Sequence, residues 1–411
     1  MVHGLHTASV DTFPRVLVLL PESEKIGGCT YVRVTGPLSF LKEKGYPVDW
    51  MTQETARFLA FGGKLGISNY ELVVFPRTAD VGDGRVVKLV KLLNSVGLAT
   101  VFETDDDYTN EFRHTIDGDA NTIMNEVTAI TVSTPHLRAQ CAKHTKTPIY
   151  LLQNCIDLRF WNEQAVRTPR VVDGLTIGIV GTTTHYADWK LAKDALYQIG
   201  ENYPDVNFVI GGFFPDYLQD LPRLTRLESV PYQEYPSLVR QVDIGLCPLV
   251  PDDNFNKSKS GIKAMEYWTA GAAVVASDCS VYNRVVDADR GALVSTTAEW
   301  YGAIKALIEN PALRAEQVAN GQKWIRCNRN MEHNSMFWWD VYAEVYQKYG
   351  GHIDEHIITQ WAMGHGATGR KGINRDNVLP LSRPSSRRWS HNPDRADASR
   401  DRRRPAARRG S

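Results

Sequence analysis

Short apolar runs alternate with segments of helical periodicity along most of residues 14–330. Runs such as 15–20 and 99–103 consist mainly of apolar residues, which indicates strands that are buried on both faces. Helical patterns fit between the runs, for example over 37–45 and 85–96. Strands that alternate with helices in this way predict a parallel sheet covered by helices on both faces.

The alternating pattern restarts at residue 175, after a polar segment at 157–174 that contains Pro169 and reads as a linker. We therefore predict two tandem Rossmann-like α/β domains, 14–165 and 171–334, that face each other across a cleft. An aromatic helix at 335–350 is expected to dock on a domain, and 351–411 is expected to be a tail. The predicted strands are 15–20, 71–75, 99–103, 129–133 and 148–152 in the first series, and 175–180, 207–210, 226–230, 243–247, 272–277 and 292–295 in the second.

The composition is that of a soluble globular protein, with 43% hydrophobic and 23% charged residues in 411 positions. No apolar stretch is long enough to span a bilayer, and residues 1–13 lack the apolar centre of a signal peptide. The six cysteines are far apart and form no CxxC pair, which argues against a zinc site and against a disulfide framework. We expect a cytoplasmic protein.

The formal net charge of zero conceals a basic C-terminus. Residues 366–411 contain 13 Lys and Arg against 4 Asp, a net charge of +9. The segment is poor in apolar residues, so it is expected to be disordered from about residue 366. Such a tail could bind nucleic acid, anionic lipid or another acidic surface, or it could be a solvated extension without an essential role.

The segment 255–278 carries most of the chemical information. It predicts a helix over 261–270, with Ser260 as its N-cap and Gly271 at its end, followed by a strand. Lys259, Lys263 and Glu266 share one side of this helix. A helix N-terminus favours anions, so this end could hold a diphosphate while Glu266 accepts hydrogen bonds from a ribose. The alternative is a surface helix with a solvated Lys–Glu pair. The donor-binding residues predicted here are Ser258, Lys259, Ser260, Gly261, Lys263 and Glu266.

This segment resembles the C-terminal signature of retaining GT-B glycosyltransferases, in which two glutamates stand eight positions apart. Glu266 matches the second glutamate, which in the family binds the donor ribose. Ser258 stands where the first would be, so the chain is closer to a bacterial and phage-associated subgroup with an S-K-S-x-x-K-x-x-E-Y motif. The resemblance implies transfer with retention of configuration and without a metal.

Two further loops agree with this resemblance by position. The loop 181–190 follows the first strand of the second domain and is expected to open a helix, and in the subgroup the corresponding loop approaches the donor phosphates. In the first domain, Gly28 follows the first strand, where GT-B proteins place a glycine-rich loop. A glycine pair after a strand is by itself a weak signal. These loops add Gly28, Gly181, Thr182, Thr183 and His185 to the predicted donor-binding residues.

The acidic stretch at 104–107 follows the predicted strand 99–103. Asp105 and Asp106 are therefore expected at the cleft edge of the first domain. Adjacent carboxylates can bind a divalent metal, but GT-B enzymes hold the departing diphosphate with helix termini and basic residues. We predict that the two aspartates bind or orient the acceptor, the alternatives being a solvated turn or a metal site. With them, Lys259 and Lys263 are the predicted catalytic residues.

The sequence thus predicts a glycosyltransferase that uses a nucleotide sugar, with UDP favoured, as co-substrate and needs no further cofactor. The acceptor could be a glycan, a protein or modified DNA. Alternatives are a nucleotide-sugar epimerase of the same fold and a non-catalytic nucleotide- or sugar-binding protein. A nucleic-acid-binding protein is suggested by the tail alone. A dinucleotide-dependent oxidoreductase is disfavoured because no G-x-G-x-x-G follows either first strand.

Overall fold

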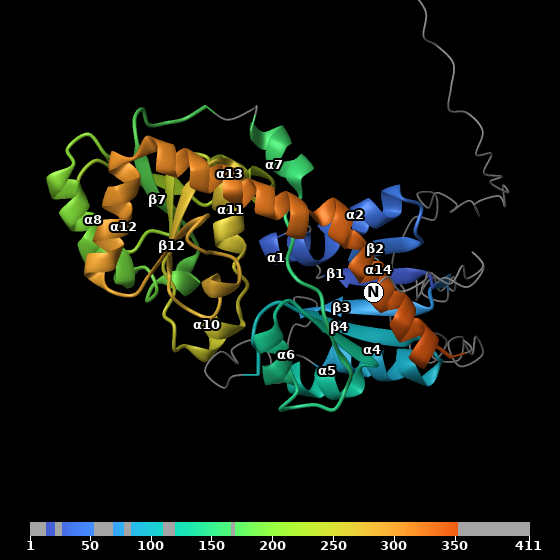
Figure 1. Cartoon of the computed structure of the whole chain (residues 1–411). Coiled ribbons are helices and arrows are strands. Elements are labelled where there is room, and N and C mark those ends of the chain that lie inside the picture. The colour runs from blue at the N-terminus through green and yellow to red at the C-terminus, as the bar shows by residue number, and fades with distance from the viewer. Residues whose placement is uncertain are drawn as a thin grey trace, which may run out of the picture. The chain divides into compact units, whose positions relative to one another are not determined.

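The computed structural model describes residues 14–20, 27–52, 69–77, 84–109, 120–165 and 169–351. Residues 1–13 and the predicted Arg-rich tail lie outside these described residues, so the predictions made for them stay predictions. The described chain contains two six-stranded sheets, each built from one of the two series of apolar runs (Figure 1).

The first sheet has the strand order β2-β1-β3-β4-β5-β6, and all its neighbouring strands are parallel. Every residue of β1, β3, β4 and β5 is buried, which explains why apolar residues predominate in these strands. The strands are β1 (Val16–Leu20), β2 (Val48–Thr52), β3 (Leu72–Pro76), β4 (Ala99–Thr104), β5 (Ala129–Val132) and β6 (Ile149–Leu151).

The second sheet has the order β12-β11-β10-β7-β8-β9 and is also parallel throughout. Its strands are β7 (Thr176–Gly181), β8 (Asn207–Gly212), β9 (Leu224–Glu228), β10 (Ile244–Cys247), β11 (Ala273–Ser277) and β12 (Gly291–Val294). Two tandem doubly wound α/β domains, as predicted, are therefore present. The predicted domain boundaries themselves stay predictions.

The sequence prediction failed at two edge strands. It omitted β2, and it placed β9 at 226–230, two residues late. Both strands lie at an edge of their sheet, and Val48 is the one fully buried residue of the ten. An edge strand buries fewer side chains, so its apolar pattern is weaker.

Helices connect the strands of each sheet. In the first domain they are α1 (Gly28–Thr30), the π-helical turn η2 (Tyr31–Thr35), α2 (Gly36–Glu43), α4 (Arg85–Ser95), α5 (Ala120–Glu126) and α6 (Pro135–Cys141), followed by α7 (Leu158–Ala165). In the second domain they are α8 (Lys190–Asn202), α9 (Tyr235–Val239), α10 (Asn254–Ser258), α11 (Ile262–Ala270), α12 (Thr297–Glu309) and α13 (Pro311–Asn328), with short 3-10 turns η6 (Thr183–His185), η7 (Asp216–Leu218), η8 (Tyr232–Glu234) and η9 (Tyr282–Arg284).

The last helix, α14 (Met331–Tyr349), begins four residues before the predicted start at 335 because the Asn330 side chain caps it. Its aromatic residues do dock, as expected. Trp338, Trp339 and Tyr342 pack with β1, β3 and α2 in the core of the first domain. The last described helix therefore packs in the first domain, although it follows the second domain in the sequence.

Candidate functional site

A cavity of about 930 Å³ is lined by residues from both sheets. The loops that follow β3 and β4 contribute from the first domain, and the loops after β7 and β9 and the start of α11 contribute from the second. In parallel α/β sheets, ligands bind at this carboxyl edge of the strands. The predicted site residues that line the cavity are Gly28, Asp105, Asp106, Gly181, Thr182, His185, Lys259, Ser260, Lys263 and Glu266.

The start of α11 differs from the prediction in one respect. Gly261, not Ser260, is the N-cap residue, and no side chain caps the helix. A Cβ at Gly261 would stand 2.4 Å from Val285 Cγ2, so a glycine is required there by space. The Ser260 hydroxyl oxygen instead accepts a hydrogen bond of 2.8 Å from Asn154 Nδ2 in the first domain.

Glu266 and Lys263 form a part-buried polar group with Tyr235, a residue that the sequence analysis missed. Lys263 Nζ lies 3.0 Å from Glu266 Oε2 and 2.5 Å from the Tyr235 hydroxyl, which itself donates to Glu266 Oε2 at 3.0 Å. Glu266 is only 4% exposed. The alternative of a solvated surface pair is therefore wrong. The carboxylate is fixed at the cavity wall, where it can accept hydrogen bonds from a ligand.

Aromatic rings extend this wall from Tyr235. Tyr232 stacks on Tyr235 with a centroid distance of 5.7 Å and on Phe160 at 5.6 Å, and Tyr31 lies against both Tyr232 and Phe160. Burial, together with the charge of Glu266, raises the pKa of Tyr235 well above its usual value. Tyr235 therefore stays protonated and serves as a hydrogen-bond donor to Glu266.

The loop after β7 holds His185 against a buried aspartate. As predicted, this loop leads from β7 into a helix, α8, with the 3-10 turn η6 inside the loop. His185 Nδ1 lies 2.8 Å from Asp188 Oδ2. Burial lowers the pKa of His185, and the nearby Lys259 and Lys263 lower it further. The imidazole is therefore neutral at neutral pH, with its Nδ1 proton donated to the carboxylate.

Asp188 connects three loops around the cavity. Its Oδ1 accepts hydrogen bonds from Val250 N at 2.9 Å and from Asn256 Nδ2 at 2.7 Å, while its Oδ2 holds His185. Burial alone would raise the pKa of Asp188, but the hydrogen bonds from His185 and Val250 outweigh this and lower it. The i,i+3 spacing of His185 and Asp188 was visible in the sequence and could have indicated the pair.

We predict that Asp188→Asn lowers the free energy of unfolding by about 2–3 kcal/mol, because charged acceptors make stronger hydrogen bonds than neutral ones. The folded-state pKa of Asp188 is below the unfolded value of about 3.9, so its contribution is present above that pH and is lost on acidification. The variant should therefore lose less stability than wild type between about pH 5 and pH 2. Urea unfolding at several pH values measures both effects.

Asp194→Asn is the matched control, because Asp194 is an exposed aspartate on α8. Its unfolding free energy should stay within about 0.5 kcal/mol of wild type. Equal stability of Asp188→Asn and this control would contradict the role of Asp188.

Three predicted donor-binding residues, Thr183, Ser258 and Gly261, are not among the residues that line the cavity. Ser258 is fully buried, and its hydroxyl donates to the carbonyl of Asn254 in α10 at 3.3 Å. The carbonyl of Ser258 accepts a hydrogen bond from Thr134 Oγ1 at 2.8 Å. Ser258 thus supports the loop before α11, and its hydroxyl bonds within α10 and does not line the cavity.

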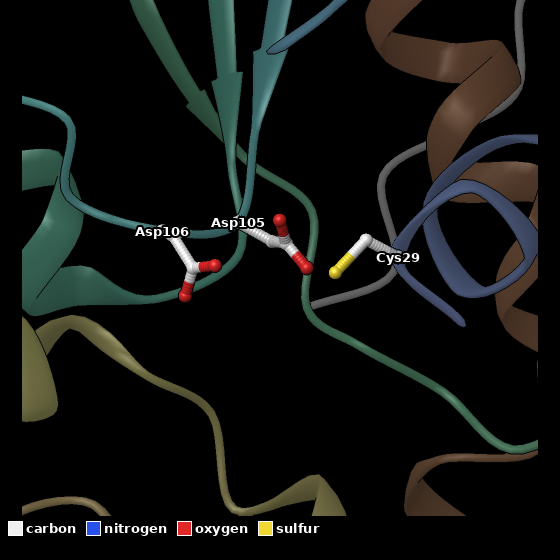
Figure 2. A group of neighbouring side chains, drawn as sticks. All are labelled: Cys29, Asp105 and Asp106. Atoms are coloured by element: carbon white, nitrogen blue, oxygen red, sulfur yellow. The ribbon is translucent and has the colours of Figure 1, made fainter. Parts of the chain in front are cut away.

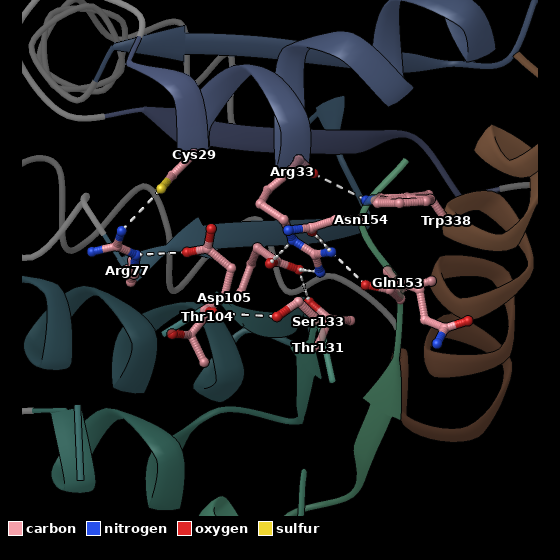
Figure 3. A network of polar contacts seen from close by, with 12 residues as sticks. Cys29, Arg33, Arg77, Thr104, Asp105, Thr131, Ser133, Gln153, Asn154 and Trp338 are labelled. Carbon is pink, nitrogen blue, oxygen red and sulfur yellow. Dashed lines mark hydrogen bonds and ion pairs between the residues drawn. The ribbon is translucent and has the colours of Figure 1, made fainter. Parts of the chain in front are cut away.

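The acidic stretch after β4 lies at the cavity, as predicted, but it is paired with Arg77. Arg77 Nε lies 2.8 Å from Asp105 Oδ1 (Figure 3). Arg77 Nη2 lies 3.0 Å from Asp106 Oδ2. Burial alone would raise the pKa of Asp105, but the Arg77 and Arg33 guanidiniums outweigh it and lower the pKa. Asp107 instead turns away and accepts hydrogen bonds from Thr109. The pairing is inconsistent with a solvated turn.

Among the described residues, one group has metal-ligating atoms close together. Ligand atoms of Cys29, Asp105 and Asp106 lie within 4.8 Å of one another (Figure 2). Arg77 already supplies a cation to both carboxylates, and its Nη2 lies 3.1 Å from Cys29 Sγ. Burial raises the pKa of the Cys29 thiol, which keeps it protonated and a poor ligand. The donor set therefore does not favour a metal ion.

Comparisons with known proteins agree with this geometry. Residues 174–310, which contain the whole second sheet, match the family model described as glycosyl transferases group 1. A search of curated proteins finds no significant match. Within the described residues, no helix has the length and apolar character that a membrane span requires.

Several solved structures share the fold at low sequence identity. Sucrose-phosphate synthase from Thermosynechococcus elongatus has a TM-score of 0.58 and 15% identity, covering 81% of this chain and 100% of that one. The Anabaena protein HepE in complex with UDP-glucose has a TM-score of 0.57 and 15% identity, covering 82% of this chain and 100% of that one. A glycosyltransferase from Rickettsia africae has a TM-score of 0.57 and 10% identity, covering 81% of this chain and 98% of that one.

These findings confirm the predicted GT-B fold, and the family match confirms the prediction of a glycosyltransferase. The roles of the individual site residues stay predictions.

Proposed function

We propose that this chain transfers a glycosyl group from a UDP-sugar to an acceptor, with retention of configuration and without a metal ion. The observation that carries the proposal is the Lys263–Tyr235–Glu266 group at the start of α11, in which a buried carboxylate is held at the wall of the cavity. A carboxylate fixed beside a lysine at a helix N-terminus suits a ribose next to a diphosphate.

The donor is expected to lie along the second domain. Glu266 accepts hydrogen bonds from the ribose, while Lys259, Lys263 and the free N–H groups at the start of α11 hold the diphosphate. Thr182 and the backbone at Gly181 face the same space from the loop after β7. The structure of HepE with UDP-glucose has the same fold, which makes UDP the first nucleotide to test.

The chemistry requires stabilisation of the leaving group. As the bond between the sugar C1 and the phosphate oxygen breaks, its electrons pass to the diphosphate and the sugar gains oxocarbenium character. Positive groups placed in advance at the diphosphate lower this barrier. Lys259 and Lys263 supply such groups without a metal.

The acceptor is expected on the side of the first domain. Asp105 and Asp106 line the cavity there, held in place by Arg77, and their carboxylates can accept hydrogen bonds from an acceptor hydroxyl. Retention follows if that hydroxyl attacks from the face that the diphosphate leaves and gives its proton to the diphosphate.

A product assay tests the proposal. The full chain is incubated with UDP-, GDP- and ADP-sugars, with EDTA or Mg²⁺, and with a panel of glycan, protein and DNA acceptors. A transferase releases nucleoside diphosphate and forms an α-glycoside from an α-linked donor, with equal rates in EDTA. Release of a free epimerised sugar would indicate an epimerase, and no release from any donor would favour a binding protein.

A further inference from the structure

A buried ion pair in the first domain connects to the cavity through one asparagine. Arg33 and Glu103 have side chains only 3% and 2% exposed, and they are joined by contacts of 2.7 Å (Nε–Oε1) and 3.1 Å (Nη2–Oε2). The Thr131 hydroxyl also donates to Glu103. The guanidinium of Arg33 is therefore held in a fixed orientation.

The remaining N–H groups of Arg33 fix the amide of Asn154. Arg33 Nη1 donates to Asn154 Oδ1 at 2.8 Å and also to the Leu152 carbonyl (Figure 3). Because a guanidinium only donates, the atom that faces it must be the amide oxygen. Asn154 Nδ2 then faces the other way and donates to Ser260 Oγ at 2.8 Å.

Ser260 thus has an occupied acceptor and a hydroxyl hydrogen to donate. Within the described chain, the contact with Asn154 is its one side-chain hydrogen bond, and Ser260 lines the cavity. Resting on the proposed function, we propose that Arg33, Asn154 and Ser260 form a relay of hydrogen bonds that presents the Ser260 hydroxyl to the diphosphate of the donor substrate. Asn154 is then a positioning residue, supplied to the donor site by the first domain.

The direction of the relay and its surroundings both favour an anionic acceptor. Each link donates toward the cavity, and hydrogen bonds aligned in this way polarise one another. The end of the relay lies beside Gly261, the N-cap of α11, and between Lys259 and Lys263 in sequence. The hydroxyl keeps its proton and only donates a hydrogen bond, which strengthens as the diphosphate gains charge.

Asn154→Asp tests the relay because it keeps the shape of the side chain but replaces its donor with a carboxylate oxygen. The Ser260 hydroxyl must then donate to the new carboxylate and turns away from the cavity. The expected result is a rise of about tenfold or more in the Kd of UDP, with the Kd of uridine unchanged because uridine lacks phosphate. Ser260→Ala should give a similar loss, and adding Asn154→Leu, which breaks the relay without introducing a charge, to Ser260→Ala should weaken UDP binding no further.

The measurement is isothermal titration of the full chain with UDP and uridine, with GDP and guanosine and ADP and adenosine in parallel. Thr134→Val is the matched control, since it removes another hydrogen bond between the two domains, the 2.8 Å contact with the Ser258 carbonyl. It should leave the Kd of UDP within about threefold of wild type. Thermal unfolding of each variant confirms that it is folded.

The outcomes are distinguishable. If wild type binds a nucleoside diphosphate and Asn154→Asp binds it equally well, the relay is wrong and the proposed function stands. The relay is also wrong if the losses of UDP affinity caused by the Asn154 and Ser260 substitutions add in the double variant. It is likewise wrong if uridine binding is weakened as much as UDP binding, or if Thr134→Val shows the same loss. If wild type binds none of the three diphosphates, the proposed function fails, and the relay fails with it.

Discussion

Replacing Arg33 with methionine is expected to lower the free energy of unfolding by about 3–5 kcal/mol. The substitution leaves the Glu103 carboxylate buried in the first domain without its cation. It also removes the donor to Asn154 and the stacking of Arg33 on Trp338, at 5.4 Å from the ring centroid. Urea unfolding followed by tryptophan fluorescence measures the loss.

Two further variants separate the ion pair from general damage. Arg159→Met breaks the Arg159–Glu43 pair, which has similar contacts but is 47% and 56% exposed, and should cost no more than about 1 kcal/mol. The double variant Arg33→Met/Glu103→Leu removes both charges and should recover much of the stability that Arg33→Met loses. A loss below about 1 kcal/mol for Arg33→Met would show that Glu103 is not held as a buried charge.

Replacing Lys263 with methionine is expected to lower the rate of sugar transfer by about 10²–10³-fold. The lysine places a positive charge at the cavity wall, in contact with both Glu266 and Tyr235. Its loss removes a cation from the leaving diphosphate and one of the two groups that orient Glu266. Release of nucleoside diphosphate from the sugar nucleotide, measured at saturating donor, reports the change.

Lys257→Met is the control for Lys263→Met. Lys257 belongs to α10, pairs with Asp252 at 3.5 Å and is not among the residues that line the cavity. The transfer rate of Lys257→Met should stay within about twofold of wild type, since that charge lies outside the cavity and is paired with the 96% exposed Asp252. Comparable rates for the two variants would contradict the assignment of the diphosphate to the start of α11.

The interior of both sheets could be predicted because it depends on burial alone. Strands such as β1, β4 and β7 are buried at every position, so apolar residues predominate in their sequences. The edge strands β2 and β9 could not be placed with the same accuracy, because half-exposed residues leave a weaker pattern. Local periodicity therefore predicts the central strands of each sheet better than the edge strands.

The candidate site also contains residues that the sequence could place and residues that it could not. Lys263 and Glu266 lie three residues apart on one helix, so their proximity followed from helical geometry. Arg77 immediately follows β3 and could have been placed at the same edge as Asp105, since the carboxyl ends of parallel strands meet there. Tyr235 could not have been found, because its pairing with Glu266 depends on how α9 packs against α11.

Asn154 and Ser260 show the limit most clearly. They are 106 positions apart, and no local pattern connects them. Ser260 resembles a helix N-cap in the sequence, but the N-cap of α11 is Gly261, and the serine is held by Asn154 of the other domain. A serine before a helix can cap the helix or bind a side chain elsewhere, and the sequence alone does not show which of these hydrogen bonds it makes.

The most direct test of the donor site is a thermal-shift measurement with nucleoside diphosphates and their sugars, in EDTA and in Mg²⁺, on wild type and Glu266→Ala. At 100 times its Kd, a ligand stabilises the folded state by about 2.7 kcal/mol, which gives a clear shift. We predict that a UDP-sugar raises the melting temperature of wild type equally in EDTA and Mg²⁺ and fails to do so for Glu266→Ala. No shift of wild type with any nucleotide, or an equal shift of both proteins, would contradict a nucleotide-sugar site at α11.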